Sequence, residues 1–173
     1  DWFYDAVMAA TANGWFGGTS GTTFSPLTPT SRGMIATILH RMEGTPKANA
    51  ASFDDVAADA YYANGIAWAE ANGIVSGYGS GNYGPNDNVT REQLATILYR
   101  YAGYKGYNVS KTAALDSFTD GKSVSGYAKE AMSWAVGSGL ISGRGNGTLA
   151  PTANAARAEV ATLLVRFNEL FIK

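Results

Sequence analysis

The sequence predicts an all-α domain, mainly helical with long loops, and three observations support this prediction. One unit is written three times along the chain, and each copy places an arginine, Arg32, Arg91 or Arg157, at the start of a helix-like run. Apolar residues follow each arginine at the spacing of one helix face. A glycine-rich stretch precedes each run, which indicates a long turning loop between helices.

The repeats predict one cooperative domain, 1–173, because a unit of this length needs its neighbours to bury its apolar face. The copies span residues 1–44, 52–103 and 117–173. The second and third copies open with an aspartate-containing segment that has no counterpart in the first. We therefore expect a truncated first copy in a piece of a longer protein, whose other domains are the cargo.

Each copy begins with a short helix. In the second copy Tyr62, Ile66 and Ala69 lie at helical spacing, and Asn72-Gly73 ends the run. A glycine just past a helix readily takes a left-handed conformation, and the apolar residue after it folds back on the last turn. A glycine-rich loop, which a ligand can approach closely, follows at residues 76–85. Residues 142–151 match this loop well, and residues 17–26 match it less well.

The second helix of each copy starts at the arginine. Thr90 is a predicted N-cap, and Gln93 three residues later completes a capping box. Ser31 can cap the first copy, but Ala156 has no side-chain acceptor, so the third helix is expected to fray more easily at its start. The apolar stripe recurs in all three copies, as a three-helix bundle about a pseudo-threefold axis requires: Ile35, Ile38, Leu39 and Met42; Leu94, Ile97, Leu98 and Tyr101; Val160, Leu163, Leu164 and Phe167.

The position of the arginine suggests an anionic partner, since cations stabilise the other end of a helix and the unpaired N–H groups here favour an anion. That partner could be an internal carboxylate, in a structural salt bridge, or a ligand carboxylate or phosphate held by the guanidinium fork. The glycine loops and nearby aromatic residues, such as Trp15, Tyr78 and Tyr83, favour a ligand with sugar rings. Trp68 and Trp134 belong to the same region of the repeat, and two interpretations stay open for them, core packing, which we favour, and contact with the ligand.

Composition excludes several classes of function. The formal net charge of −1 provides no broad positive field for nucleic acid or an anionic membrane. The absence of cysteine excludes thiol catalysis and iron–sulfur ligation. No apolar run approaches the ~18 residues of a membrane-spanning helix. Asp87 is the only carboxylate between Gly73 and Thr90, too few for a calcium loop, and no metal or cofactor is predicted.

No catalytic constellation repeats with the unit. His40 is the only histidine, and its counterparts in the other copies are Tyr99 and Val165. No zinc-hydrolase or serine-hydrolase motif is present. We therefore predict a binding module and not an enzyme.

These motifs, taken in order, resemble the S-layer homology family over essentially the whole chain. Its repeat typically shows an F-x-D-V opening, a G-I-V-x-G loop, F-x-P and a T-R-A-E helix. This chain shows Phe53-Asp54-Asp55-Val56, Gly73-Ile74-Val75-Ser76-Gly77, Tyr83-Gly84-Pro85 and Thr90-Arg91-Glu92-Gln93. The resemblance implies a three-pronged spindle around a central three-helix bundle, with ligand grooves between the prongs.

The resemblance also implies a function. Members of the family anchor proteins non-covalently to the bacterial cell wall, outside the cell, by binding a secondary cell-wall polysaccharide that often carries a pyruvate ketal. The ketal carboxylate would meet the motif arginine. The candidate ligand-binding residues are then Arg32, Arg91, Arg157, Ser76, Gly77, Tyr78, Ser142, Gly143, Arg144, Trp15, Gln93 and Glu159.

The copies depart from the family motif in different ways. Gly33-Met34 and Glu92-Gln93 replace its Ala-Glu in the first and second copies, Ala156 replaces its Thr in the third, and Arg144 stands where Tyr78 stands in the second loop. We therefore expect unequal grooves and rank that of the second copy first.

Two alternatives stay open: a protein-binding or self-assembling module of a surface layer, and a binder of wall glycan or peptidoglycan without pyruvate. As an isolated domain the chain is expected to be a monomer. Because the motif arginine is expected to meet the anionic ligand, Arg91→Ala should weaken binding. Because Arg91 is also expected to be exposed, the same change should alter the free energy of unfolding by no more than about 1 kcal/mol.

Overall fold

The computed structural model describes residues 1–172, and its regular structure is helical. This part of the chain forms α1 (Tyr4–Ala12), α2 (Arg32–Met42), α3 (Ala63–Ala71), α4 (Arg91–Tyr104), η1 (Gly121–Ser123), η2 (Gly126–Ala128), α5 (Lys129–Gly137) and α6 (Arg157–Phe171). Strand-like pairing in these residues is limited to isolated bridges between the repeats. The prediction of an all-α fold with long loops is confirmed.

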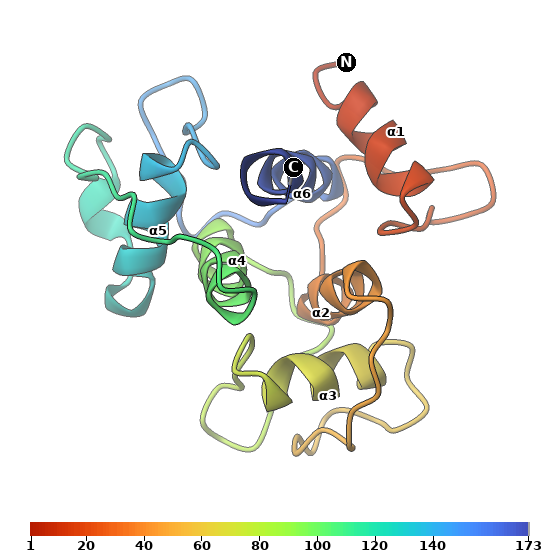
Figure 1. The fold of residues 1–173 in the computed structure, drawn as a ribbon. Coiled ribbons are helices and arrows are strands. Elements are labelled where there is room, and N and C mark those ends of the chain that lie inside the picture. Colours follow the sequence, from red (N-terminus) through yellow and green to blue (C-terminus); the bar gives the residue numbers. More distant parts are fainter. Residues whose placement is uncertain (173) are drawn as a thin grey trace.

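Three helices occupy the centre of the molecule and three lie outside them. The helices that start at the motif arginines, α2, α4 and α6, are seen nearly end-on at the centre of Figure 1, while α1, α3 and α5 lie in separate lobes. The outer helix α3 packs on α2, α5 packs on α4, and α1 packs on α6. The short helix of the first repeat therefore covers the central helix of the last one.

The short helices end as the sequence predicts. Gly14, Gly73 and Gly139 follow their last turns with φ of 72°, 68° and 80°. The N–H of Ile74, just beyond Gly73, donates to the carbonyl of Ala69 at 2.8 Å. This closure satisfies a carbonyl that would otherwise be left unpaired at the helix end.

The core lies between the central helices and under the outer ones. The apolar stripes of α2, α4 and α6 are buried in it, except that Met42, at the end of the α2 stripe, is partly buried and packs against it. Trp134 is fully buried, and its ring lies 5.5 Å from that of Tyr99 and 5.6 Å from that of Phe171. Trp68 is 2% exposed. Both tryptophans are core residues, as expected.

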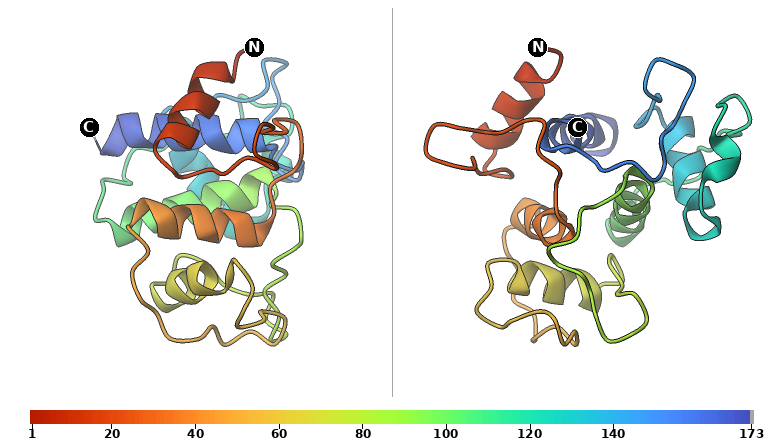
Figure 2. Two further views of the ribbon diagram at one scale, coloured as in Figure 1. Left: turned by 90° about the vertical axis from the view of Figure 1, so that its right-hand side faces the viewer. Right: turned by 180° about the vertical axis from the view of Figure 1, so that it is seen from behind.

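A closed ring of backbone hydrogen bonds joins the three segments that lead into the central helices. Thr30 N–H donates to Ala155 O at 2.9 Å, Ala155 N–H donates to Val89 O at 2.9 Å, and Val89 N–H donates to Thr30 O at 2.8 Å. These segments meet at the centre in the right-hand view of Figure 2. The ring ties each repeat to the other two and fixes where the central helices begin.

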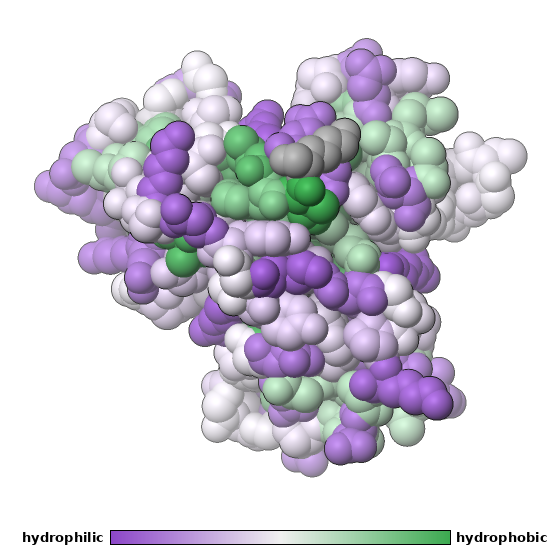
Figure 3. All heavy atoms as spheres, in the orientation of Figure 1, coloured by the Kyte–Doolittle hydropathy of each residue, from purple (hydrophilic) through white to green (hydrophobic). Residues whose placement is uncertain are grey.

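The lobes present a largely polar surface in Figure 3, with an apolar patch beside the C-terminal end of α6. At that end Leu170 and Ile172 are 45% and 46% exposed. None of the described helices combines the length and the apolar character needed to span a bilayer.

Candidate functional site

The first turn of each central helix is hydrogen-bonded to another repeat. At α2, Arg32 N–H donates to Asp87 O at 2.9 Å and Gly33 N–H donates to Pro85 O at 2.8 Å. The first two N–H groups of α4 and α6 make the matching bonds, to Ala153 and Pro151 and to Thr28 and Pro26. The expectation that unpaired N–H groups here favour an anion is therefore wrong. Any anion recognition at this place depends on side chains.

The three motif arginines are buried, and each holds a loop of another repeat. Arg32, Arg91 and Arg157 are 6%, 7% and 4% exposed, so the expected exposure of Arg91 is wrong. Burial lowers the pKa of Arg91 and of Arg157 by desolvation. Each Nε donates to a carbonyl at the end of a glycine loop, at 2.9, 2.8 and 2.8 Å, on Tyr83, Leu149 and Phe24 respectively. The arginine of one repeat thus meets the loop of the next.

An aspartate fixes the loop carbonyl that accepts the guanidinium. The Asp55 carboxylate accepts the N–H groups of Tyr83 and Gly84, both at 2.8 Å. Asp120 accepts the matching pair of N–H groups in the third repeat, also at 2.8 Å. Burial works against the charged form of Asp55, but these donors and the nearby Arg32 outweigh it and lower the pKa of the carboxyl group. The opening segments of the second and third repeats therefore position the loops.

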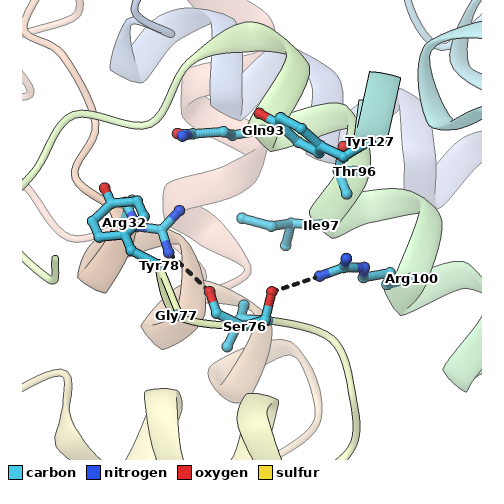
Figure 4. A pocket seen from close by; sticks show the side chains of 10 residues that line it. Arg32, Ser76, Gly77, Tyr78, Gln93, Thr96, Ile97, Arg100 and Tyr127 are labelled. Atoms are coloured by element: carbon cyan, nitrogen blue, oxygen red, sulfur yellow. Dashed lines mark hydrogen bonds between the residues drawn. The ribbon is translucent and has the colours of Figure 1, made fainter. Parts of the chain in front are cut away.

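The loop and the central helix of the second repeat enclose a cavity of about 280 Å³ next to Arg32, which we call the Arg32 groove (Figure 4). Arg32 Nη2 donates to Ser76 O at 3.1 Å, and Arg100 Nη1 donates to Ser76 Oγ at 3.2 Å. The two guanidinium groups therefore reach into one cavity from different helices. Tyr127, from the third repeat, stands at its rim and is 57% exposed.

Two further cavities repeat this plan. The Arg157 groove, of about 160 Å³, lies between Arg157, loop residues 16–18 and α2. The Arg91 groove, of about 430 Å³, lies between Arg91, loop residues 142–144 and α6. Each of the three grooves contains a second arginine further along the central helix and an exposed aromatic residue from the remaining repeat. These pairs are Arg100 and Tyr127 in the Arg32 groove, Arg41 and Tyr61 in the Arg157 groove, and Arg166 and Trp2 in the Arg91 groove.

The predicted site residues line these grooves, with one exception. Ser76, Gly77, Tyr78 and Gln93 lie around Arg32, and Ser142, Gly143, Arg144 and Glu159 lie around Arg91. Trp15 is half-buried against the core and lines none of the three grooves. The sequence ranked the groove of the second copy first, but the glycine loop and the motif arginine of that copy belong to different grooves. Arg41, Arg100 and Arg166 were missed, although their recurrence at one position of the repeat was a usable signal.

The three guanidinium groups differ in what their Nη1 atoms meet. Arg91 Nη1 forms an ion pair with Glu159 Oε1 at 2.8 Å, and Arg144 Nη2 reaches the same oxygen at 3.3 Å. Arg157 Nη1 lies 3.9 Å from the sulfur of Met34. Within residues 1–172, Arg32 Nη1 donates no hydrogen bond. The sequence left two arrangements open for the motif arginine, an internal salt bridge and a guanidinium without a carboxylate partner. Both occur in the described residues, the first at Arg91 and the second at Arg32 and Arg157.

The Arg32 guanidinium also lies against two aromatic rings. Its carbon lies 4.6 Å from the ring centre of Tyr78 and 4.5 Å from that of Tyr83. Such stacking fixes the plane of the fork while leaving its edge available. No cluster of acidic or histidine side chains in the described residues could hold a metal ion.

Comparison with known proteins gives the family. The S-layer homology domain matches residues 1–33, 52–95 and 117–161. The chain is 31% identical to an amylopullulanase of Thermoanaerobacterium thermosulfurigenes, over 95% of this chain and 9% of that protein. It is 32% identical to exoglucanase XynX of Acetivibrio thermocellus, over 95% of this chain and 15% of that protein. It is 30% identical to the surface-layer 125 kDa protein of Lysinibacillus sphaericus, over 94% of this chain and 14% of that protein.

The chain thus spans only a small part of each of these relatives. Its three matched segments fall one in each repeat, and together they cover most of the chain. The chain belongs to the S-layer homology family.

Proposed function

We propose that this chain anchors a longer protein non-covalently to the bacterial cell wall, by binding an anionic secondary wall polysaccharide that carries a pyruvate ketal. Relatives named as surface-layer, cell-surface and cell-wall proteins support a place on the outside of the bacterial cell. The observation that carries the glycan proposal is the recurrence, in all three grooves, of two arginines beside a glycine loop and an exposed aromatic ring.

The Arg32 groove offers a separate contact for each part of a pyruvylated sugar. The ketal carboxylate would accept charge-assisted hydrogen bonds from Arg32 and Arg100. The ketal methyl group would lie on Val75 and Ile97, which line the groove. The sugar ring would stack on Tyr78 or Tyr127, whose side chains are 51% and 57% exposed.

The proposed role is binding without catalysis. Three of the relatives are enzymes by name, an amylopullulanase, an exoglucanase and an endoglucanase, but this chain corresponds to only 9%, 15% and 16% of their lengths. We assign their chemistry to parts outside the matched region and propose that such parts are the cargo which this module holds at the wall.

Binding to isolated wall polysaccharide, measured by cosedimentation before and after the ketals are removed with mild acid, tests the proposal. We expect binding to be lost with the ketals. We also expect Arg100→Ala to weaken binding at least about fivefold, because it removes one charge-assisted contact. Lys111→Ala is the matched control, since it removes an exposed positive charge outside the grooves and should leave binding unchanged.

Other outcomes would favour the alternatives. Full binding to ketal-free polysaccharide would mean that the ligand is a wall glycan without pyruvate. No binding, combined with self-association in sedimentation velocity experiments, would instead indicate a module that assembles with copies of itself.

A further inference from the structure

The glycine loop of the second repeat places a tyrosine in the Arg32 groove where the other two loops have a different side chain. The counterparts of Tyr78 are Thr19 in the first repeat and Arg144 in the third. The centre of the Tyr78 ring lies 4.6 Å from the guanidinium carbon of Arg32, and the side chain is 51% exposed. The ring therefore covers part of the motif arginine and is also open to the groove that it lines (Figure 4).

A hydrogen bond made outside the groove fixes the position of this ring. The Tyr78 hydroxyl group donates to Oδ2 of Asp87 at 2.9 Å. Asp87 is not among the residues that line the groove, and its counterparts are Thr28 and Ala153. Its backbone is held in turn, because its carbonyl accepts the Arg32 N–H at 2.9 Å. Burial and the bond to Asp87 raise the pKa of Tyr78, so the hydroxyl group keeps its proton and continues to donate at neutral pH.

Gly84 leaves the space that this hydrogen bond needs. A methyl group here would lie 2.6 Å from Cε2 and 2.9 Å from Oη of Tyr78, and it would also overlap the Asp87 carboxylate. Backbone conformation alone does not require glycine, because Ser25 and Ala150 adopt a similar positive φ at the equivalent positions, 54° and 50° against 72° for Gly84. The tyrosine, the glycine and the aspartate occur together in one repeat, and the other two repeats have none of them at these positions. This joint occurrence indicates that the three residues form one structural unit.

We infer that Asp87 is a positioning residue, which holds Tyr78 against Arg32 and fixes an aromatic surface at a place where the other two grooves have none. This role rests on the proposed function. A ring that is already ordered loses less conformational freedom when a sugar packs on it, so the ligand binds more tightly. The threonine and the arginine at the equivalent positions of the other loops offer no ring to the ligand. The Arg32 groove should therefore have the highest affinity of the three.

An NMR titration that follows backbone amide signals measures each groove separately. The probe is monovalent, the methyl glycoside of a hexosamine carrying a 4,6-linked pyruvate ketal. Each loop supplies a glycine amide that reports on its own groove: Gly77 for the Arg32 groove, Gly143 for the Arg91 groove and Gly18 for the Arg157 groove. For the wild type we expect the Gly77 signal to give the lowest dissociation constant.

Removal of the hydrogen bond should weaken this groove alone. Asp87→Ala and Tyr78→Phe are each expected to raise the dissociation constant at Gly77 at least about threefold, with no change at the other two reporters. The double variant should lose no more affinity than either single variant, because both changes remove the same bond. Asp87→Asn should restore most of the affinity, since its side-chain carbonyl can still accept the hydroxyl group. Thr28→Ala, the matched control in the first repeat, should alter none of the three constants.

The outcomes separate the role of Asp87 from the proposed function. Unchanged binding at Gly77 in either single variant, or losses that multiply in the double variant, would overturn the inference while the anchoring role stands. An Arg32 groove that binds the probe no more tightly than the other two would also overturn it. If a variant does not fold, Gly84→Ala decides, because its methyl group displaces the Tyr78 hydroxyl group and should cause the same loss. Absence of any shift in the wild type and in every variant would remove the proposed function itself.

Discussion

Each motif arginine serves both the fold and the groove. In Arg32 the Nε atom and Nη2 atom hold the carbonyls of Tyr83 and Ser76, while Nη1 has no such partner in the described chain. The loop is thereby fixed by the same group that faces the proposed ligand. A guanidinium can do this because its five donors point in fixed, different directions.

This double use predicts that the two arginines of one groove differ in their effect on stability. Arg32→Ala is expected to lower the free energy of unfolding by about 2 kcal/mol, because a buried group loses two charge-assisted hydrogen bonds and two ring contacts. Arg100 is exposed, so Arg100→Ala should change it by less than about 0.5 kcal/mol. Urea denaturation followed by circular dichroism measures both, and equal midpoints for the two variants would contradict this assignment.

At the level of elements, the central helices share one way of starting. Their N-cap residues have similar extended conformations, with φ and ψ of −82° and 160° at Ser31, −82° and 164° at Thr90, and −72° and 155° at Ala156. Ser31 and Thr90 accept the N–H of the third helical residue, whereas the Ala156 side chain has no acceptor. The start of α6 keeps the cross-repeat bonds that all three central helices make, here to Thr28 and Pro26 of the first repeat, and Glu159 Oε2 accepts the N–H of Ala156 at 2.9 Å.

Restoring the missing cap is predicted to stabilise the protein. Ala156→Thr should raise the free energy of unfolding by about 0.5 to 1 kcal/mol, because the backbone is already in the conformation that a capping threonine needs. Thr90→Ala, the reciprocal change, should lower it by about 1 kcal/mol. Thermal melts of the two variants and the wild type give the comparison. A destabilised Ala156→Thr would mean that the cross-repeat bonds leave no room for a cap.

At the scale of the whole molecule, contacts from one repeat to another tie the three lobes together. The backbone ring through Thr30, Val89 and Ala155 joins all three repeats, and α1 packs on the distant α6. Each groove is also assembled from all three repeats. A repeat removed from its neighbours would lose part of its core cover and part of every groove.

We therefore predict a single cooperative unfolding transition. The fluorescence of Trp68 reports on the lobe containing α3, and that of Trp134 reports on the lobe containing α5. Each can be isolated by replacing the other tryptophans with phenylalanine or tyrosine. Both signals should share the midpoint of the far-ultraviolet circular dichroism, whereas separate midpoints would show that the lobes unfold independently.

The sequence alone determined the properties that depend on neighbouring residues. Helical periodicity gave the central stripes, the Asn72-Gly73 pair gave the end of α3, and the threonine–glutamine pair gave the capping box of α4. Repetition identified the motif arginines and glycine loops as candidate site residues. These signals are local, so they are legible without knowing how the chain is threaded through space.

Only the tertiary structure decided which arginine meets which loop and which grooves hold an internal carboxylate. Arg32 and Ser76 are 44 positions apart, Arg91 and Glu159 are 68 apart, and Arg157 and Gly17 are 140 apart. Three similar units can in principle place their own or a neighbour's loop on each arginine, and local preferences do not distinguish these arrangements. The arrangement is fixed by burial of the central helices and by the backbone ring, which depend on the whole chain at once.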